Sequence, residues 1–320
     1  MECVLCGLHN HGRAFKVQEI LFGTRESFEY LECASCGTLQ LRQIPTDMER
    51  YYPSDYYSIS AKGGPVERLS PLRQFVRAAR TDYYIGWTNI LGWAIDHIAH
   101  NYFEMTWEWF RGRASTRSRI LDVGCGSGEL LRSMRAQGFY YLTGIDPFVA
   151  HSVEYQGLRI IRGQLCALDE QFDLVMLHHS LEHMANPLGA LQRLRHMLSK
   201  RGSVLVRVPV AGTYPGKHYG LNWIGLDPPR HLFVPTRTGI SKLAERAGLG
   251  VTEYWFDTTE WTLLTSEAIS RGFPPYDRQT GQFVFMKHFT TSEILDAQTR
   301  AAALNQAEDG DTACFVLRVV

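Results

Sequence analysis

The sequence has no excess of charge of either sign. Its 33 lysine and arginine residues balance 33 aspartate and glutamate residues, so the formal net charge is zero. A dedicated nucleic-acid binder normally carries a basic excess, so this balance argues against nucleic acid as a partner. The sequence also lacks an uninterrupted apolar run of about 18 residues, which a transmembrane helix needs. Its first residues, MECVLCGLHN, lack the basic and apolar regions of a secretory signal. We therefore expect a soluble, cytoplasmic protein.

Cysteine is scarce, and its count is odd. Seven cysteines without a secretory signal argue against a disulfide framework. The first four form two C-x-x-C pairs, each followed by glycine: Cys3, Cys6, Cys33 and Cys36. A two-residue gap lets both thiolates of a pair face one tetrahedral Zn²⁺ at about 2.3 Å. Two pairs supply four ligands, so the sequence predicts a closed, structural zinc site, with iron in a rubredoxin-like site as the alternative.

Short apolar runs alternate with helical stretches from residue 119 onward, and this alternation predicts an α/β fold with a parallel sheet. Strands are predicted at 119–123, 141–145, 158–162, 172–177, 203–208, 250–256 and 314–320. Helices are predicted near 128–137, 148–155, 187–199, 236–247 and 260–272. The segment between the last two strands is too long for a hairpin, so it should hold helices of its own.

We expect three parts along the chain. Residues 1–60 would form a small zinc-binding module, and residues 61–114 a helical linker or lid. Residues 115–320 would form the α/β domain, with a helical insertion at 257–313. The helical stretch at 82–112 is rich in aromatic residues. Core packing, a lid or homodimer surface, and an interfacial membrane helix are its three interpretations, and its lack of lysine disfavours the last.

A glycine-rich turn follows the first predicted strand of the α/β region. Glycines there let the backbone approach a ligand closely. A dinucleotide-binding loop would read G-x-G-x-x-G, but Glu129 or Leu131 stands where the last glycine belongs. No Gly-Lys-Ser/Thr follows, so a phosphate-binding P-loop is excluded as well.

The string Asp122-Val-Gly124-Cys-Gly126-Ser-Gly128 resembles motif I of the class I S-adenosylmethionine (SAM) methyltransferases. The resemblance implies a Rossmann-like, seven-stranded sheet with SAM as the cofactor. It also implies that Asp146, after the second strand, accepts from the ribose hydroxyls. Gln164 takes the place of the family's acidic residue that receives the adenine amino group. His178 begins the segment that lies beside the sulfonium and the substrate in this family. The implied cofactor residues are therefore Asp122, Gly124, Gly126, Gly128, Asp146, Gln164 and His178.

A wider resemblance covers the paired cysteines, a tyrosine-rich stretch and the methyltransferase core. These features are similar to a bacterial group of zinc-ribbon methyltransferases, which includes sugar C-methyltransferases and enzymes of glycan or natural-product pathways. The tyrosines in question are Tyr51, Tyr52, Tyr56 and Tyr57. The C-methyltransferases usually place Glu-His where this chain has Arg230-His231, so the resemblance favours another acceptor chemistry.

Methyl transfer from SAM mainly requires a well-placed nucleophile. A hydroxyl acceptor also needs a base for its proton, and histidine has a suitable pKa of about 6.5. His179 follows the fourth strand, at the sheet edge where α/β proteins bind ligands. His231 and Tyr219 lie on the loop after the fifth strand. These three residues are the predicted catalytic candidates.

The sequence thus predicts a SAM-dependent methyltransferase acting on a small molecule, with O-methylation of a sugar, glycan precursor or secondary metabolite as the leading hypothesis. Sugar C-methylation is the first alternative. A zinc-ribbon scaffold on a degenerate methyltransferase fold is an alternative of another class, which the intact glycine loop and Asp146 disfavour. Methylation of RNA or protein is disfavoured by the neutral charge.

Overall fold

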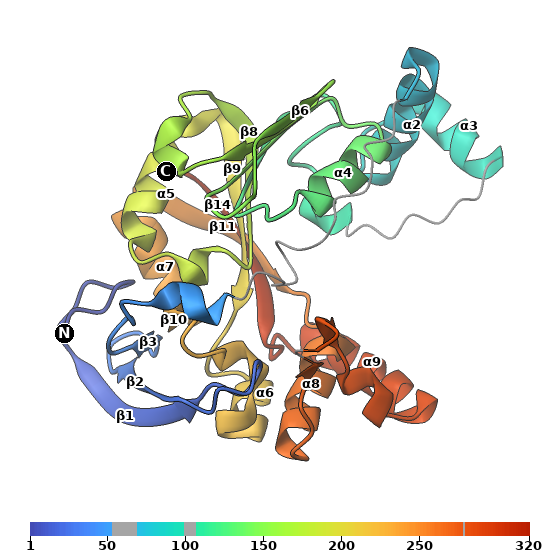
Figure 1. The fold of residues 1–320 in the computed structure, drawn as a ribbon. Helices are drawn as coiled ribbons and strands as arrows, with labels where there is room; N and C mark the ends of the chain where they lie inside the picture. The colour runs from blue at the N-terminus through green and yellow to red at the C-terminus, as the bar shows by residue number, and fades with distance from the viewer. Residues whose placement is uncertain (53–68, 99–106, 278) are drawn as a thin grey trace. The chain divides into compact units, whose positions relative to one another are not determined.

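The computed structural model describes residues 1–52, 69–98, 107–277 and 279–320. The chain divides into two compact units (Figure 1). The first unit comprises Met1–Tyr57, His179–Gln192 and Val206–Val320, and the second comprises Ser58–His178 and Arg193–Leu205. No helix among the described residues is long and apolar enough to cross a membrane. The expected boundary between residues 60 and 61 lies outside the described residues.

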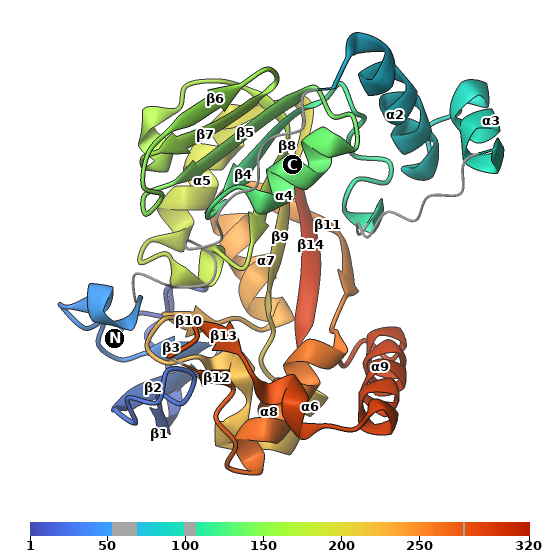
Figure 2. The ribbon, with the colours of Figure 1, turned by 45° about the vertical axis from the view of Figure 1, so that its right-hand side comes forward.

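The largest sheet has eight strands in the order β11-β14-β9-β8-β4-β5-β7-β6. In the second unit, β4 (Arg119–Val123) pairs in parallel with β5 (Tyr141–Asp146) and with β8 (Phe172–His178). The strand β5 also pairs in parallel with β7 (Leu158–Arg162), as the strands of Figure 2 show. The central strand β4 is buried from Ile120 to Val123, as expected for a parallel strand covered on both faces. The carboxyl ends of these strands share one edge, where a ligand site is expected.

The helices of the second unit follow local sequence signals. The helix α2 (Pro71–Tyr84) begins with Pro71 in its first turn, and the Ser70 side chain accepts a hydrogen bond from the Arg73 amide. The helix α4 (Glu129–Ala136) begins directly after the glycine-rich turn. Gly138, with φ of +98°, lets α2 approach closely, because a Cβ there would lie 2.5 Å from the Ala78 nitrogen. The two helices therefore depend on a glycine at this position.

A four-stranded antiparallel sheet of the first unit combines three strands near the N-terminus with one strand from much later in the sequence (Figure 1). Its order is β1 (His11–Gln18), β2 (Ser27–Cys33), β3 (Leu39–Leu41) and β10 (Phe233–Val234). The N-terminal segment is thus completed by a strand from residue 233 onward, and it is part of a larger folding unit.

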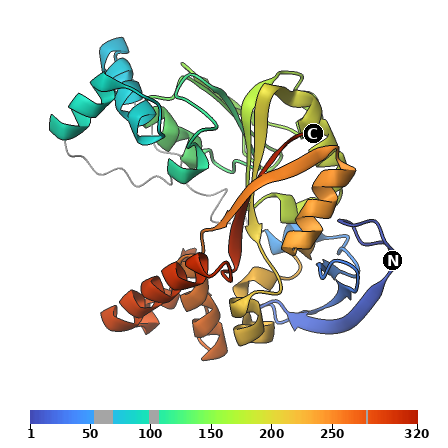
Figure 3. The same ribbon diagram turned by 180° about the vertical axis from the view of Figure 1, so that it is seen from behind.

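The C-terminal half of the first unit is a long antiparallel strand pair with helices inserted in its connection. The strand β11 (Leu249–Phe256) pairs with β14 (Thr312–Val319). Between them, α8 (Glu260–Ser270) packs on α9 (Thr291–Gln306), as Figure 3 shows from behind. A capping box between Thr290 and Glu293 starts α9. The remaining elements are β9 (Leu198–Pro209), which runs through both units, α5 (Pro187–Met197), α6 (Tyr214–Tyr219), α7 (Arg237–Arg246) and the short strands β12 (Tyr276–Asp277) and β13 (Gln282–Phe283).

All seven predicted strands form in their expected places, but the helix expected over 148–155 is wrong. That segment is a turn followed by β6 (Val153–Tyr155), which pairs antiparallel with β7. Gly157 in the connecting turn has φ of +78°, and a Cβ there would lie 2.3 Å from the Tyr140 carbonyl oxygen. The turn at Gly157 therefore makes residues 153–155 a strand of a hairpin instead of a helix. The additional strand β6 also explains why the sheet has eight strands instead of the expected seven.

The aromatic stretch expected as one helix over 82–112 is interrupted. The helix α2 ends at Tyr84, and Gly86 has a left-handed φ of +91°. The Asn89 side chain then accepts a hydrogen bond from the Gly92 amide, and α3 (Ile90–Ile98) begins. A short 3-10 turn at Trp107–Trp109 follows later in the chain, and residues 99–106 lie outside the described part.

A buried cation ties the N-terminal segment to the loop before β10. Arg230 is only 1% exposed, and its Nη2 lies 2.9 Å from a Glu19 carboxylate oxygen. Its Nε lies 2.9 Å from Asp227, and its guanidinium lies over the Phe22 ring. Glu19 is fully buried as well. Because two buried carboxylates depend on one guanidinium, removal of that cation would leave both without charge compensation.

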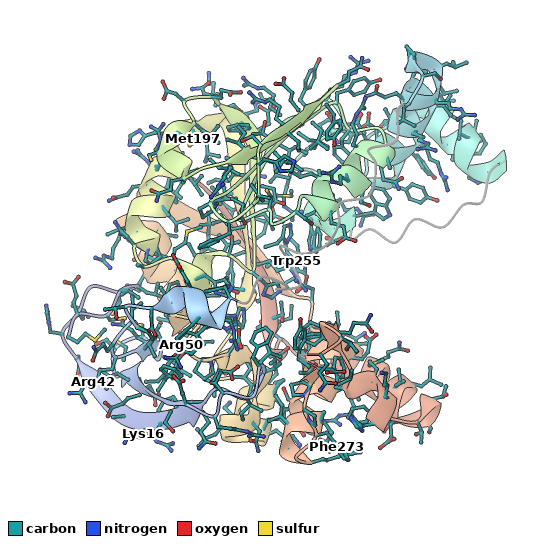
Figure 4. All side chains as sticks on the ribbon, viewed as in Figure 1. Lys16, Arg42, Arg50, Met197, Trp255 and Phe273 are labelled. Carbon is teal, nitrogen blue, oxygen red and sulfur yellow. The ribbon has the colours of Figure 1, made fainter. Side chains whose placement is uncertain are left out.

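We expect Arg230→Met to lower the free energy of unfolding by about 3–5 kcal/mol, the usual cost of leaving a buried charge unpaired. The matched control is Arg42→Met, at the residue labelled in Figure 4. Arg42 forms an ion pair with Glu29, and its side chain is 60% exposed. Exposed pairs contribute about 0–1 kcal/mol, so the control should change stability little. Urea denaturation measures both, and equal losses in the two variants would contradict the assigned role of Arg230.

Candidate functional site

The glycine-rich turn of the second unit has a backbone that side chains rarely tolerate. Gly124, Gly126 and Gly128 have φ of +77°, +52° and +79°. A Cβ on Gly128 would lie 2.1 Å from the Ile160 side chain. Glycine is therefore required by the conformation, and the turn presents main-chain groups at the start of α4.

Two aspartates lie beside this turn. Asp146, at the end of β5, accepts hydrogen bonds from the amides of Gly126 at 3.0 Å and Phe148 at 2.8 Å. Asp122, within β4, is 3% exposed. Burial raises the pKa of Asp122 to about 7, and the negative charge of Asp146 adds to the effect. The turn and both carboxylates thus form one polar centre.

The other predicted cofactor residues follow neighbouring strands of the same unit. His178 ends β8, and its ring centroid lies 4.2 Å from the Trp109 ring centroid. Gln164 comes shortly after β7, caps a short 3-10 turn at Leu165–Ala167, and is exposed. Because β4, β5, β7 and β8 are parallel neighbours, these residues and the glycine turn share the carboxyl edge of the sheet.

The four paired cysteines of the first unit converge on one point. All four sulfur atoms lie within 4.8 Å of one another. The closest pairs are Cys3 with Cys36 at 3.7 Å and Cys6 with Cys33 at 3.6 Å. Zinc–sulfur bonds of about 2.3 Å in a tetrahedron place sulfur atoms about 3.8 Å apart. The spacing therefore fits a tetrahedral metal ion.

Each cysteine pair is held by the same kind of turn. The amide of Gly7 donates to the Cys3 carbonyl at 2.9 Å, and the amide of Gly37 donates to the Cys33 carbonyl at 2.7 Å. Both glycines have left-handed φ values, +77° and +73°. The glycine after each second cysteine is thus explained by the turn that brings both thiols of a pair to one side.

A second polar centre of the first unit consists of His179, Glu182, His183 and His231, which we call the histidine–glutamate cluster. Glu182 lies on the short 3-10 turn Leu181–His183 and is fully buried. Its Oε1 is 3.3 Å from Nδ1 of His179 and 4.0 Å from Nε2 of His231. The ring centroids of His183 and His231 are 4.9 Å apart. The structure thus brings together both predicted histidine bases around one carboxylate.

Main-chain carbonyls fix the orientation of two of these imidazoles. Nδ1 of His183 lies 2.8 Å from the Arg230 carbonyl oxygen, and Nδ1 of His231 lies 2.9 Å from the Gly225 carbonyl oxygen. A carbonyl can only accept, so each Nδ1 carries a proton and the lone pair of the neutral ring is on Nε2. Burial lowers the pKa of His183 to about 4, with the nearby His231 as the second cause. This ring is therefore neutral at physiological pH.

The carboxyl group of Glu182 stays ionised despite its burial. Burial alone would raise its pKa, but the hydrogen bond from His179 and favourable electrostatic interactions with the surrounding imidazoles lower the pKa to about 2. The cluster therefore holds a negative charge at a place with no access to water. That charge polarises the imidazoles around it.

His179 has an unusual backbone conformation for a residue with a side chain. Its φ is +48°, a region that non-glycine residues rarely adopt, and such strain is often found at functional sites. Its amide donates to the Arg207 carbonyl at 2.8 Å. The Arg207 guanidinium contacts Nε2 of the same histidine and forms a 2.6 Å ion pair with Asp257. With 39% of its side chain exposed, His179 can reach a ligand.

Tyr219, the third predicted catalytic residue, has different surroundings. It ends α6, is 6% exposed, and its ring lies 4.7 Å from the His218 ring. Burial raises its pKa, and Arg300 is its hydrogen-bond partner. The described contacts thus place Tyr219 with His218 and Arg300 instead of with the histidine–glutamate cluster.

Two members of that cluster, Glu182 and His183, are not among the site residues predicted from the sequence. Glu182 and His183 follow the fourth strand in the string His178-His-Ser-Leu-Glu-His183. The signal that could have found Glu182 is its spacing, because a residue three positions after His179 can turn back toward it in a short helical turn. The sequence gives no corresponding signal for the approach of the loop that carries His231.

Comparisons with known proteins identify the kind of domain. Residues 97–254 match the family model of a methyltransferase domain. A ubiquinone biosynthesis O-methyltransferase of Histophilus somni is 33% identical over 103 residues, which cover 27% of this chain and 43% of that relative. An enzyme of the same name from Dinoroseobacter shibae is 34% identical over 150 residues, which cover 41% and 59%. The chain thus spans about half the length of these relatives.

Among solved structures, the mitomycin 7-O-methyltransferase aligns with a TM-score of 0.41 and 12% identity, covering 64% of this chain and 49% of that one. The match to the family model, which spans residues 97–254, is the finding that supports a methyltransferase. The expectation of a methyltransferase is confirmed at this level.

The raised pKa of Asp122 has a consequence for stability. Between pH 4 and about pH 7 the folded protein keeps a proton that the unfolded chain has released, so folding loses stability as the pH rises through this window. We expect the cofactor-free protein to lose about 2–4 kcal/mol from this group between pH 4 and pH 8. Asp122→Asn should lose less over the same interval. Urea denaturation at several pH values tests this, and parallel pH curves for both proteins would contradict it.

Proposed function

We propose that the protein transfers a methyl group from SAM to a hydroxyl group of a small molecule, namely a sugar, glycan precursor or secondary metabolite. The observation that carries this proposal is the Gly124–Gly128 turn, whose Gly126 amide is hydrogen-bonded to Asp146 at the start of α4. This centre belongs to the stretch that matches the methyltransferase model. The two relatives named as O-methyltransferases support oxygen as the acceptor atom.

The residues of the glycine turn fit a nucleoside ligand. A carboxylate can accept about four hydrogen bonds, and the two amides on Asp146 use only part of this capacity. Asp146 is therefore fixed in place and still able to accept from two ribose hydroxyls. Gln164 would receive the adenine amino group through its amide oxygen, and His178 would lie beside the sulfonium. SAM, when bound, supplies an electrophilic methyl group.

His179 is the residue best suited to take the proton of the acceptor. Its Nδ1 donates to the Glu182 carboxylate, which orients the ring and stabilises the imidazolium that forms. Its Nε2 is then the accepting nitrogen, and the acceptor hydroxyl would replace the Arg207 contact there. Bound SAM would supply the methyl group to the acceptor oxygen and keep the sulfur–methyl electron pair on sulfur, and Nε2 of His179 would take the hydroxyl proton. His231 is the second candidate, but its side chain is only 11% exposed.

The four cysteines are proposed to hold one structural Zn²⁺. Four thiolates fill a tetrahedral site and leave no open position, so this ion would stabilise the N-terminal sheet without taking part in catalysis. The sulfur spacing of 3.7 Å between Cys3 and Cys36 and of 3.6 Å between Cys6 and Cys33 supports this assignment.

We expect Cys6→Ser to lose one equivalent of metal per chain, because a three-thiolate site binds zinc more weakly. Cys166→Ser is the matched control, since Cys166 is exposed and lies outside the cysteine cluster. Elemental analysis of dialysed protein measures zinc and iron in one experiment. Retention of the full metal content by Cys6→Ser would contradict the site, and iron in place of zinc would change its identity.

The proposed reaction is tested with His179→Asn. Asparagine tolerates a left-handed backbone, so this variant removes the base while keeping the local fold. Turnover should fall about 10²–10⁴-fold, the usual contribution of a general base, while SAM affinity stays unchanged. Mass spectrometry with a panel of hydroxyl-bearing sugar nucleotides and glycolipid precursors measures product. Calorimetry measures SAM binding.

Two further variants complete this experiment. His196→Asn, an exposed histidine on α5, should keep full turnover. Gly126→Val should abolish SAM binding, because its φ of +52° and the ligand both exclude a branched side chain. Failure of the parent protein to bind SAM would overturn the proposal, and full turnover of His179→Asn would remove His179 from it.

A further inference from the structure

The histidine–glutamate cluster contains a set of donors that metal ions favour. One carboxylate oxygen of Glu182 and one nitrogen each of His183 and His231 lie within 4.8 Å of one another. Apart from the four cysteines, this is the one such group found among the described residues. It lies in the first unit and shares no residue with the cysteine site.

The buried carboxylate is incompletely satisfied. Glu182 is fully buried, and its Oε2 has no hydrogen-bond partner among the residues that the structure describes. Buried polar atoms are normally paired, so an unpartnered carboxylate oxygen indicates a missing ligand. The buried guanidinium of Arg230 already pairs with Asp227 and Glu19.

The two imidazoles are oriented as in metal sites. A histidine that ligates a metal usually donates its other ring N–H to a carboxylate or a main-chain carbonyl, which fixes the ring. Nδ1 of His183 faces the Arg230 carbonyl oxygen at 2.8 Å, and Nδ1 of His231 faces the Gly225 carbonyl oxygen at 2.9 Å. Each Nε2 is thus left as the nitrogen with a lone pair.

The three ligand atoms would need to move only a little closer together to bind an ion. Nε2 of His231 lies 4.0 Å from Oε1 of Glu182, the oxygen that also contacts His179, and Oε2 of the same carboxylate is the one without a partner among the described residues. Ligand atoms at about 2.0–2.2 Å from an ion are about 3.0–3.5 Å from each other in tetrahedral or octahedral sites. Contraction by about 0.5–1 Å, within the range of a side-chain rotation, would therefore close the site around an ion.

We infer that Glu182, His183 and His231 bind a divalent transition-metal ion as a two-histidine, one-carboxylate site. The mixed nitrogen and oxygen donors favour ions such as Zn²⁺, Co²⁺, Fe²⁺ or Mn²⁺ over Mg²⁺ and Ca²⁺, which prefer oxygen alone. Three protein ligands leave at least one position open for water or for an oxygen of a ligand. The site differs in this respect from the closed cysteine site.

The open position gives the ion a chemical role next to His179, which also contacts Glu182. A hydroxyl bound to a divalent ion loses its proton more easily, so the same ion would bind and activate an acceptor hydroxyl. This consequence rests on the proposed methyl transfer, whereas the metal site itself does not.

The test uses Co²⁺ as the probe and the full, zinc-loaded protein. Co²⁺ binds less tightly than Zn²⁺ to a given site, so it leaves a zinc ion at the cysteines in place. Calorimetry should show one Co²⁺ per chain, and the absorbance of the bound ion should lack sulfur-to-cobalt charge-transfer bands. Glu182→Gln and His231→Asn should each weaken Co²⁺ binding by at least 10-fold. His196→Asn, with an exposed histidine outside the cluster, should bind Co²⁺ like the parent.

Each outcome decides the inference. Absence of saturable Co²⁺ binding, sulfur charge-transfer bands, or equal affinity in the parent and both ligand variants would overturn it, leaving a hydrogen-bonded network only. SAM binding, measured by calorimetry, and the thermal midpoint report whether a variant is folded. If neither variant folds, the Co²⁺ stoichiometry and the absorbance spectrum of the parent protein decide whether the metal site exists. Co²⁺ binding without methyl transfer would keep the metal site and remove the proposed function. Methyl transfer without Co²⁺ binding would keep the proposed function and remove the metal site.

Discussion

A carboxylate that is removed from water must be surrounded by groups that stabilise its charge, and Glu182 imposes this requirement on the first unit. Its position on a short 3-10 turn makes it the common neighbour of His179 and His231. The imidazoles of His183 and His231 are held by main-chain carbonyls of Arg230 and Gly225. The conformation of the 225–231 loop, the tautomers of the rings and the strained backbone of His179 are therefore linked through one negative charge. The same carboxylate and histidines could serve to accept a proton or to bind a cation.

Local patterns predicted the parts of the molecule that local geometry determines. The glycine turn depends on three left-handed residues within five positions, and the cysteine pairs depend on a two-residue gap followed by glycine. Each of these constraints acts within a few residues, so the sequence displays it directly. The strands of the sheet were predicted for the same reason, because an apolar run of five residues is enough to form one.

The remaining features depend on contacts between segments that are far apart in the chain. Arg230 stands out in the sequence only as a departure from a Glu-His pair, yet it forms an ion pair with Glu19, 211 positions away. The cluster around Glu182 likewise needs the 225–231 loop, which no pattern near residue 182 indicates. The segment 148–155 shows that a local pattern can also mislead. Its pattern predicted a helix, but the turn at Gly157 pairs residues 153–155 with β7 as a strand.

The pairing of β3 with β10 has a consequence for how the chain can be divided. The first unit's N-terminal sheet takes its last strand from Phe233–Val234, and the Thr236 hydroxyl donates to the Cys36 carbonyl. Arg246 also donates to the Leu5 carbonyl at 2.8 Å. Removal of the cysteine-bearing segment would leave β10, which follows His231 closely, without its partner strand β3. It would also remove Glu19, one of the two carboxylates that pair with the buried guanidinium of Arg230. A stable fragment of this protein must therefore keep the cysteine-bearing segment, although the match to the family model begins only at residue 97.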